Sequence, residues 1–185
     1  MRATMLAVVV LGLGACEMEE PADGSDTGGP EGCLADDLGL SLGTGVLEYS
    51  PVSENDDITI VHGPQGGWHI DVAGRLSNTG QEVSIAPTVT LLETGDQLAG
   101  DQNPSLQAIV DYDADACTGD FFGLRAFIDD FSPQDDLPYQ AFVCSLGGKQ
   151  LALSVRVTDF ATNRTVVEEV TLVAAHDAVD QENCP

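Results

Sequence analysis

The sequence predicts an all-β protein folded as an antiparallel β-sandwich. Along the chain, short segments alternate apolar and polar residues, which is the period of a strand buried on one face. Turn residues such as glycine, proline and asparagine separate these segments, and no long helical pattern occurs in the 185 residues. Many short strands joined by turns, without long helices, indicate a sandwich or barrel in one domain.

The clearest strand pair is the segment 58–78, ITIVHGPQGGWHIDVAGRLSN. Apolar residues alternate on both sides of residues 63–67, which read GPQGG. Glycine permits positive φ, whereas proline fixes φ and has no N–H for a strand ladder. These five residues therefore predict the loop of a β-hairpin.

The register of this hairpin follows from its apolar residues, which should share a face because a slip of one residue turns a strand inside out. The condition predicts two pairs: Ile60 with Ile70, and Ile58 with Val72. It also places His62 opposite Trp68 on the core side and His69 on the opposite, exposed side. The two histidines are therefore not expected to share a metal ion.

Five further segments are expected to form strands: 45–49, 83–91, 106–112, 151–157 and 165–174. Pro87 removes one ladder donor from the second of these, so that strand is expected to lie at an edge or to carry a bulge. Residues 120–131 fit both a strand and one face of a helix, and we expect a short helix or turn there. Residues 132–138 are expected to form a loop.

The composition is strongly acidic, with 6 Lys+Arg against 31 Asp+Glu and a net charge of −25. Such a surface repels phosphates, so nucleic acid is excluded as a partner. The charge favours a solvated surface that keeps an exported protein soluble. Binding of a cation or a basic partner is the alternative.

The N-terminal residues 1–15 are typical of a signal peptide. A basic residue, Arg2, precedes a short apolar run at 5–13 that cannot span a bilayer. The following Leu-Gly-Ala-Cys resembles the bacterial lipobox, which implies that Cys16 carries lipid and becomes the new N-terminus. Glu17 occupies the position at which aspartate marks inner-membrane retention, so the resemblance implies an outer-membrane address.

Residues 16–39 are acidic and rich in Gly, Pro and Ser, with little to bury, and are expected to be a disordered tether. The β-sandwich domain is then expected to span 40–185. Its last two segments, LSVRVTDFATNRTVVEEVTLV, resemble the closing strands of bacterial immunoglobulin-like domains. This resemblance implies an immunoglobulin-like sandwich.

Two motifs, LGTG at 42–45 and HGPQGGWH at 62–69, resemble a family of uncharacterised outer-membrane lipoproteins. Members of that family share a lipobox, an acidic linker, a G-x-Q-G-G-x-H turn and an immunoglobulin-like ending. The resemblance implies an address in the bacterial cell envelope and a fold. It implies no particular activity.

Four cysteines remain when Cys16 carries lipid, and an even number in an oxidising compartment predicts two disulfides. Three connectivities are possible. Because the ends of a domain often lie close together, we expect Cys33–Cys184 and Cys117–Cys144. Zinc is not expected, since the sequence contains no C-x-x-C spacing.

Two candidate binding sites stand out. Carboxylates that could bind calcium cluster at Asp111, Asp113, Asp115 and Asp120. The EF-hand pattern departs at Ala116, where glycine is needed, and at Phe122, where a bidentate glutamate belongs, so a solvated acidic loop is the simpler interpretation. The second candidate is a recognition loop formed by His62, Gln65, Trp68 and His69. Its alternative is that Trp68 is a core residue.

The preferred function is a lipid-anchored cell-envelope module that binds a partner or has a structural role. Its partner would be the membrane, through the lipid, together with an unknown protein or envelope polymer, and no cofactor is expected. A calcium- or metal-binding envelope protein is the second hypothesis. An enzyme is third, because the sequence holds only three histidines (His62, His69 and His176) and neither a G-x-S-x-G nor an H-E-x-x-H motif.

Lipidation gives the first testable prediction. Cys16→Ser removes the thiol that would be acylated, so the variant should move from the membrane fraction to the soluble fraction on cell fractionation. A variant that still partitions with membrane, or intact protein that begins at Met1, would contradict the anchor.

Overall fold

The computed structural model describes residues 33–34, 36–100, 106–128 and 138–184. The predicted signal peptide, Cys16 and most of the tether lie outside the described residues, as do residues 129–137 of the expected helix or turn and loop. The described part holds eleven strands and two short helices: β1 (Gly39–Thr44), β2 (Ser50–Pro51), β3 (Asp57–His62), β4 (Trp68–Ser77), β5 (Glu82–Leu91), β6 (Asp96–Ala99), β7 (Leu106–Ile109), β8 (Asp111–Asp113), β9 (Thr118–Ile128), α1 (Tyr139–Ser145), β10 (Gln150–Asp159), β11 (Thr165–His176) and α2 (Ala178–Asn183). The all-β prediction is confirmed. Neither helix is long and apolar enough to cross a membrane.

The strands form one mixed sheet that folds over itself. Its main path runs β2-β1-β4-β3-β11-β10-β5-β6, while β9 pairs with the free edge of β4, β8 with β9, and β7 with β5. All pairs are antiparallel except β3 with β11, which run in the same direction. The sequence predicted a wholly antiparallel sandwich, and this one parallel pair departs from that prediction.

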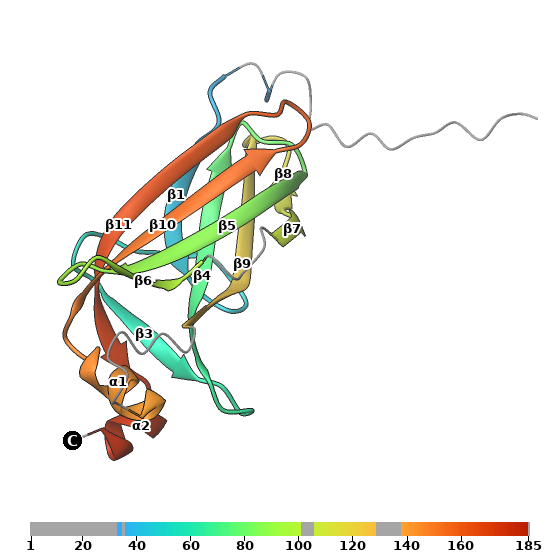
Figure 1. Ribbon diagram of the computed structural model, residues 1–185. Helices are drawn as coiled ribbons and strands as arrows, with labels where there is room; N and C mark the ends of the chain where they lie inside the picture. The colour runs from blue at the N-terminus through green and yellow to red at the C-terminus, as the bar shows by residue number, and fades with distance from the viewer. Residues whose placement is uncertain (1–32, 35, 101–105, 129–137, 185) are drawn as a thin grey trace, which may run out of the picture.

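Two layers enclose the core (Figure 1): β5, β10 and β11 cross in front of β1, β4 and β9. Side chains that alternate along the strands meet between these layers. The largest fully buried ones include Ile70, Val72, Leu76, Ile85, Leu151, Leu153 and Leu172. Burial of each such side chain contributes roughly 1.5–3 kcal/mol, which makes this core the main source of stability.

The hairpin register is confirmed at its loop end. Ile60 pairs with Ile70 and His62 with Trp68, so the loop holds residues 63–67 as expected. The predicted pairing of Ile58 with Val72 is wrong, because the ladder between β3 and β4 begins only at Ile60, and β1 takes over that edge of β4 from Ala73. On the other edge of β3, Ile58 lies opposite Ala174 of β11.

Two other sequence predictions are wrong. Residues 45–49 form the loop between β1 and β2 rather than a strand, and Gly45 there has φ of +132°, which favours glycine. Residues 120–128 form part of β9 rather than a helix or turn. The strand forms in place of a helix because β9 pairs with β4 over the whole length of β4. This pairing continues across a register shift between Val72 and Gly74.

The proline in the strand 83–91 lies where the sheet tolerates it. On one edge, β5 pairs with β10 throughout. On the other edge, the pairing of β5 with β7 extends as far as Ile85, and the pairing of β5 with β6 starts at Val89. A register irregularity follows just after Val89. Pro87 therefore occupies a gap between two partners, and its missing N–H breaks no ladder bond on that side. β5 is thus not an edge strand, and the register irregularity lies between Val89 and Thr90 rather than at Pro87, so the predicted edge or bulge is met only near the proline.

Two disulfides are present, but their predicted pairing is wrong: the bonds are Cys33–Cys117 and Cys144–Cys184. The reason is visible in Figure 1, where the first described residues and the C-terminal helix lie at opposite ends of the sandwich. Cys33 reaches the turn before β9, whereas Cys184 follows α2 and meets α1. Cys33 is buried, so the expected tether gives way to packed structure before residue 39.

The pairing can be checked by peptide mapping without reductant, which should link Cys144 to Cys184. In the loop-entropy view, the double variant Cys144→Ser/Cys184→Ser should lose about 4 kcal/mol of unfolding free energy, since the bond closes a loop of 40 residues. Denaturant unfolding measures this loss. The variant Cys33→Ser/Cys117→Ser, which removes the disulfide at the other end of the sandwich, is measured for comparison. A peptide that joins Cys33 to Cys184 would contradict the structure.

Candidate functional site

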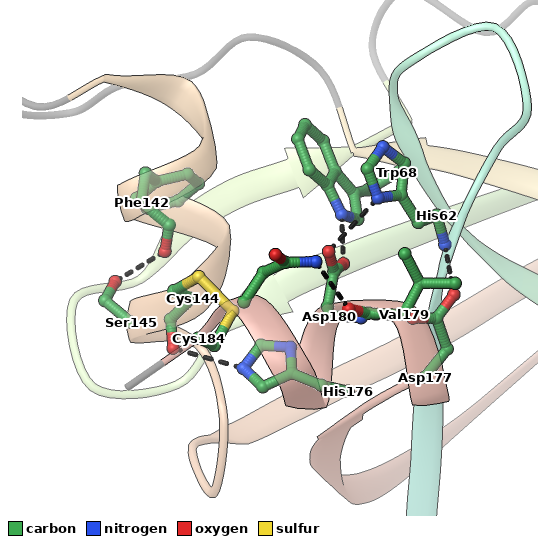
Figure 2. Close-up of a disulfide and its surroundings, with 11 residues drawn as sticks. His62, Trp68, Phe142, Cys144, Ser145, His176, Asp177, Val179, Asp180 and Cys184 are labelled. Carbon is green, nitrogen blue, oxygen red and sulfur yellow. Dashed lines mark hydrogen bonds and ion pairs between the residues drawn. A yellow bond between two sulfur atoms is a disulfide. The ribbon is translucent and has the colours of Figure 1, made fainter.

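The four residues of the expected recognition loop divide between the two faces of β4. His62 and Trp68 face the core side, where they meet the C-terminal helix (Figure 2). Gln65 and His69 line a cleft on the opposite face. The structure therefore does not bring the four side chains into one site.

On the core side, the carboxylate of Asp180 joins α2 to the hairpin. Its Oδ2 accepts a hydrogen bond from Nε1–H of Trp68, and its Oδ1 lies 3.1 Å from Nδ1 of His62. The rings of His62 and Trp68 stack with centroids 4.5 Å apart. Asp180 is 1% exposed and Trp68 7% exposed, so the tryptophan is a core residue.

Asp177 strengthens the same junction as the N-cap of α2. Its side chain accepts hydrogen bonds from the backbone N–H of Asp180 at 2.9 Å and of His62 at 2.8 Å. Burial tends to raise the pKa of Asp177, but the N–H donors outweigh it and hold the pKa below its ordinary value. The carboxylate is therefore held in its charged, accepting form.

A histidine beside a carboxylate also occurs in catalytic triads, which add a nucleophile. Among the described residues, no serine or threonine hydroxyl and no cysteine thiol is hydrogen-bonded to the side chain of His62 or Asp180. Histidine 176 is equally structural, since its Nε2 lies 3.1 Å from the carbonyl of Cys144. The contacts of His62, Trp68 and His176 at this end of the molecule therefore hold α2 against the hairpin and α1.

The opposite face of the hairpin carries a cleft of about 250 Å³. The loop 63–67 forms one wall, and His69 of β4 with Arg125 and Phe127 of β9 form the other. Hydrogen bonds from Gly63 to Gly67 at 2.8 Å and from Gly66 to Gly63 at 3.0 Å close the loop. Gly66 and Gly67 have φ of +76° and +133°, so the turn requires glycine at both positions.

His69 is buried, with 4% of its surface exposed, which corrects the predicted exposed position. Its ring lies 5.8 Å from that of Phe127, its cross-strand partner, and its Nε2 lies 3.4 Å from Oδ1 of Asp71. Burial lowers the pKa of His69 below its ordinary value, Arg125 adds to this, and Asp71 opposes it. The imidazole is therefore neutral near pH 7 and can both donate and accept a hydrogen bond.

Arg125 is unusual among the cations of this acidic chain. Arg75 binds Asp120 through two hydrogen bonds, Lys149 pairs with Glu93, and Arg164 donates to backbone carbonyls. In the described part of the chain neither Arg125 nor Arg156 has an ion pair. Of these two, Arg125 lines the cleft beside the loop 63–67, and Arg156 does not.

The four aspartates of the expected calcium site are not gathered around a common point. Asp120 is occupied by Arg75, at 2.8 and 2.7 Å. Asp113 accepts the backbone N–H groups of Asp115 and Ala116, which makes it a turn-forming residue. Over the described residues, no group of three potential metal ligands occurs. Nothing in this geometry favours calcium.

Comparisons with known proteins add little to this geometry. No protein-family model matches the chain, and no curated protein matches it. Among solved structures, the CooA pilin subunit from enterotoxigenic Escherichia coli is similar over 74% of this chain and 99% of its own, with 11% identity and a TM-score of 0.37. A similarity this weak carries no property of the pilin subunit over to this chain.

Sequence reasoning missed three residues that matter here: Arg125, Phe127 and Asp180. The first two lay in the segment expected to be a helix or turn, so their place beside the hairpin could not be seen. The alternation of residues 121–128 was the available signal, because it leaves Arg125 and Phe127 on one face of a strand. Asp180 gave no signal, since its partners are 112 and 118 residues away.

The buried histidine gives a prediction about pH. The unfolded chain protonates His69 near its ordinary pKa of about 6.5, whereas the folded protein resists protonation until a lower pH. The unfolded state therefore binds more protons below that value, and the stability held above it is lost as the pH falls.

His69→Gln removes this contribution. Denaturant unfolding from about pH 7.5 to about pH 5.5 should show the difference in stability between the wild type and the variant shrinking as the pH falls. Two curves that stay parallel would mean that His69 titrates as freely in the folded protein as in the unfolded chain.

Proposed function

We propose that this protein is a lipid-anchored module of the bacterial cell envelope that binds its ligand without chemical conversion. The ligand would occupy the cleft formed by the loop 63–67, His69, Arg125 and Phe127. One observation carries the proposal: an unpaired guanidinium, a half-exposed aromatic ring and a buried neutral imidazole converge on one hollow. A few converging polar groups beside apolar surface are typical of ligand sites.

The rest of the molecule supports a binding role over catalysis. The histidines on the core side are engaged by α2 and by the backbone of α1. The cleft offers a donor, an acceptor and a cation, but among its lining residues there is no hydroxyl, thiol or carboxylate side chain to act as a nucleophile.

The address rests on the N-terminal sequence. The lipobox-like motif ending at Cys16 and the acidic segment after it support a domain tethered to the membrane, with the outer membrane as the expected site. Two disulfides suit an oxidising compartment outside the cytoplasm. The partner would then be an envelope polymer or a protein exposed there.

Retention on immobilised envelope polymer tests this function with a matched pair of variants. Phe127 and Phe160 are equally exposed, at 46% and 45%, but only Phe127 lines the cleft. Phe127→Ala in the full chain, purified in detergent, should weaken retention by about tenfold or more, since aromatic anchors often contribute 2 kcal/mol or more.

The control Phe160→Ala should bind as the wild type does. Equal binding by both variants, or no retention of the wild type on polymer or protein from the envelope, would refute the cleft as the binding site.

A further inference from the structure

We propose that the cleft beside the loop 63–67 binds the carboxylate-bearing ring of an acidic sugar, a uronate. The inference rests on the proposed function and names its ligand class. Arg125 would hold the carboxylate, Phe127 would pack against the ring, and His69 with Gln65 would bond its hydroxyl groups.

The charge of the ligand follows from Arg125. The chain carries five times as many acidic as basic residues, yet this guanidinium has no ion pair in the part of the chain described. Its cross-strand neighbour, Asp71, turns its Oδ1 toward His69 instead. A planar guanidinium matches a carboxylate through two parallel hydrogen bonds, so an anionic ligand supplies the missing partner.

The body of the ligand follows from the other wall. Phe127 is 46% exposed beside the buried imidazole of His69. The face of an aromatic ring carries partial negative charge and attracts the C–H groups on one side of a pyranose. The Gln65 amide offers a donor and an acceptor, and the neutral imidazole has one nitrogen left for a ligand because its Nε2 lies toward Asp71; both suit hydroxyl groups.

Size limits the ligand to about one ring. The cleft holds about 250 Å³, below the roughly 300–1,000 Å³ of sites for drug-sized molecules. One wall is the loop of the hairpin, so the cleft lies at the surface, where a chain of sugars could continue on either side of the bound ring. A terminal or internal uronate of an envelope polysaccharide fits this description.

A cation or a basic peptide fits this cleft poorly, despite the net charge of −25. Asp71, the carboxylate beside His69, does not line the cleft, and Arg125 would repel a cationic ligand. The net charge of the protein repels an anion at long range, but at about 0.15 M salt this repulsion is screened beyond about 8 Å. Contact with Arg125 then decides the preference.

Ligand-observed NMR titration of the full chain in detergent, at about 0.15 M salt and about pH 7.5, tests the assignment. The probes are glucuronate, neutral glucose, and benzoate as a carboxylate without a sugar ring. Glucuronate should bind about tenfold or more tightly than glucose, because a hydrogen bond to a charged group contributes a binding free energy that corresponds to roughly such a ratio of dissociation constants. Benzoate should bind more weakly than glucuronate.

Arg125→Gln should abolish the preference for glucuronate over glucose. Arg156→Gln, at the other described arginine that has neither an ion pair nor a hydrogen bond to a carbonyl, should leave it unchanged. Chemical unfolding of both variants checks that each remains folded. Equal binding of glucose and glucuronate, a preference that survives Arg125→Gln, or tighter binding of benzoate would each overturn the uronate assignment.

These failures are distinct from failure of the proposed function. If Phe127→Ala still abolishes retention on envelope polymer, the cleft remains a binding site with another ligand. If Phe127→Ala has no effect on retention, then both proposals fall together.

Discussion

The arrangement of this molecule depends on the pairing of β4 along both of its edges. One edge pairs with β9 over its full length, and the other is divided between β3 and β1. With both edges satisfied, the strand cannot slip, and each side chain is assigned to a face. Trp68 therefore enters the core while its neighbour His69 lies on the outer face. Neighbouring residues thus serve two separate sites on one strand.

Both of those neighbours are buried, although only one faces the core. Trp68 is covered by α2, which a buried carboxylate and the Cys144–Cys184 bond hold in place. His69 is packed against Phe127 beside the loop 63–67. Burial on the outer face is what lowers the pKa of the imidazole and makes the cleft a polar but nearly uncharged hollow, with Arg125 as its one cation. The hairpin thus forms a cleft on its outer face, and packing of the hydrophobic core does not depend on that cleft.

Much of the fold could be predicted from local pattern, because strand alternation and turn residues act over a few positions. The hairpin register near Ile60 and the tolerance for Pro87 follow from such rules. The disulfide pairing and the strand at 118–128 could not be predicted, since they depend on which ends of the sandwich meet and on which strand finds β4. Half of the candidate site could be predicted. The loop 63–67 and His69 followed from the sequence pattern, whereas Arg125 and Phe127 lie in a segment whose local pattern fits both a strand and a helix.

Trp68 is the sole tryptophan of the chain, and it lies between the hairpin and the last helix. Its indole stacks on His62, meets the ring of Tyr139 edge-on at 4.8 Å and donates to Asp180. The tryptophan fluorescence of this protein, excited selectively over its three tyrosines, therefore reports on one place, the junction where helix, hairpin and disulfide come together. Emission that changes before the sheet melts would mark release of the C-terminal helix as a separate opening event, visible without any added label.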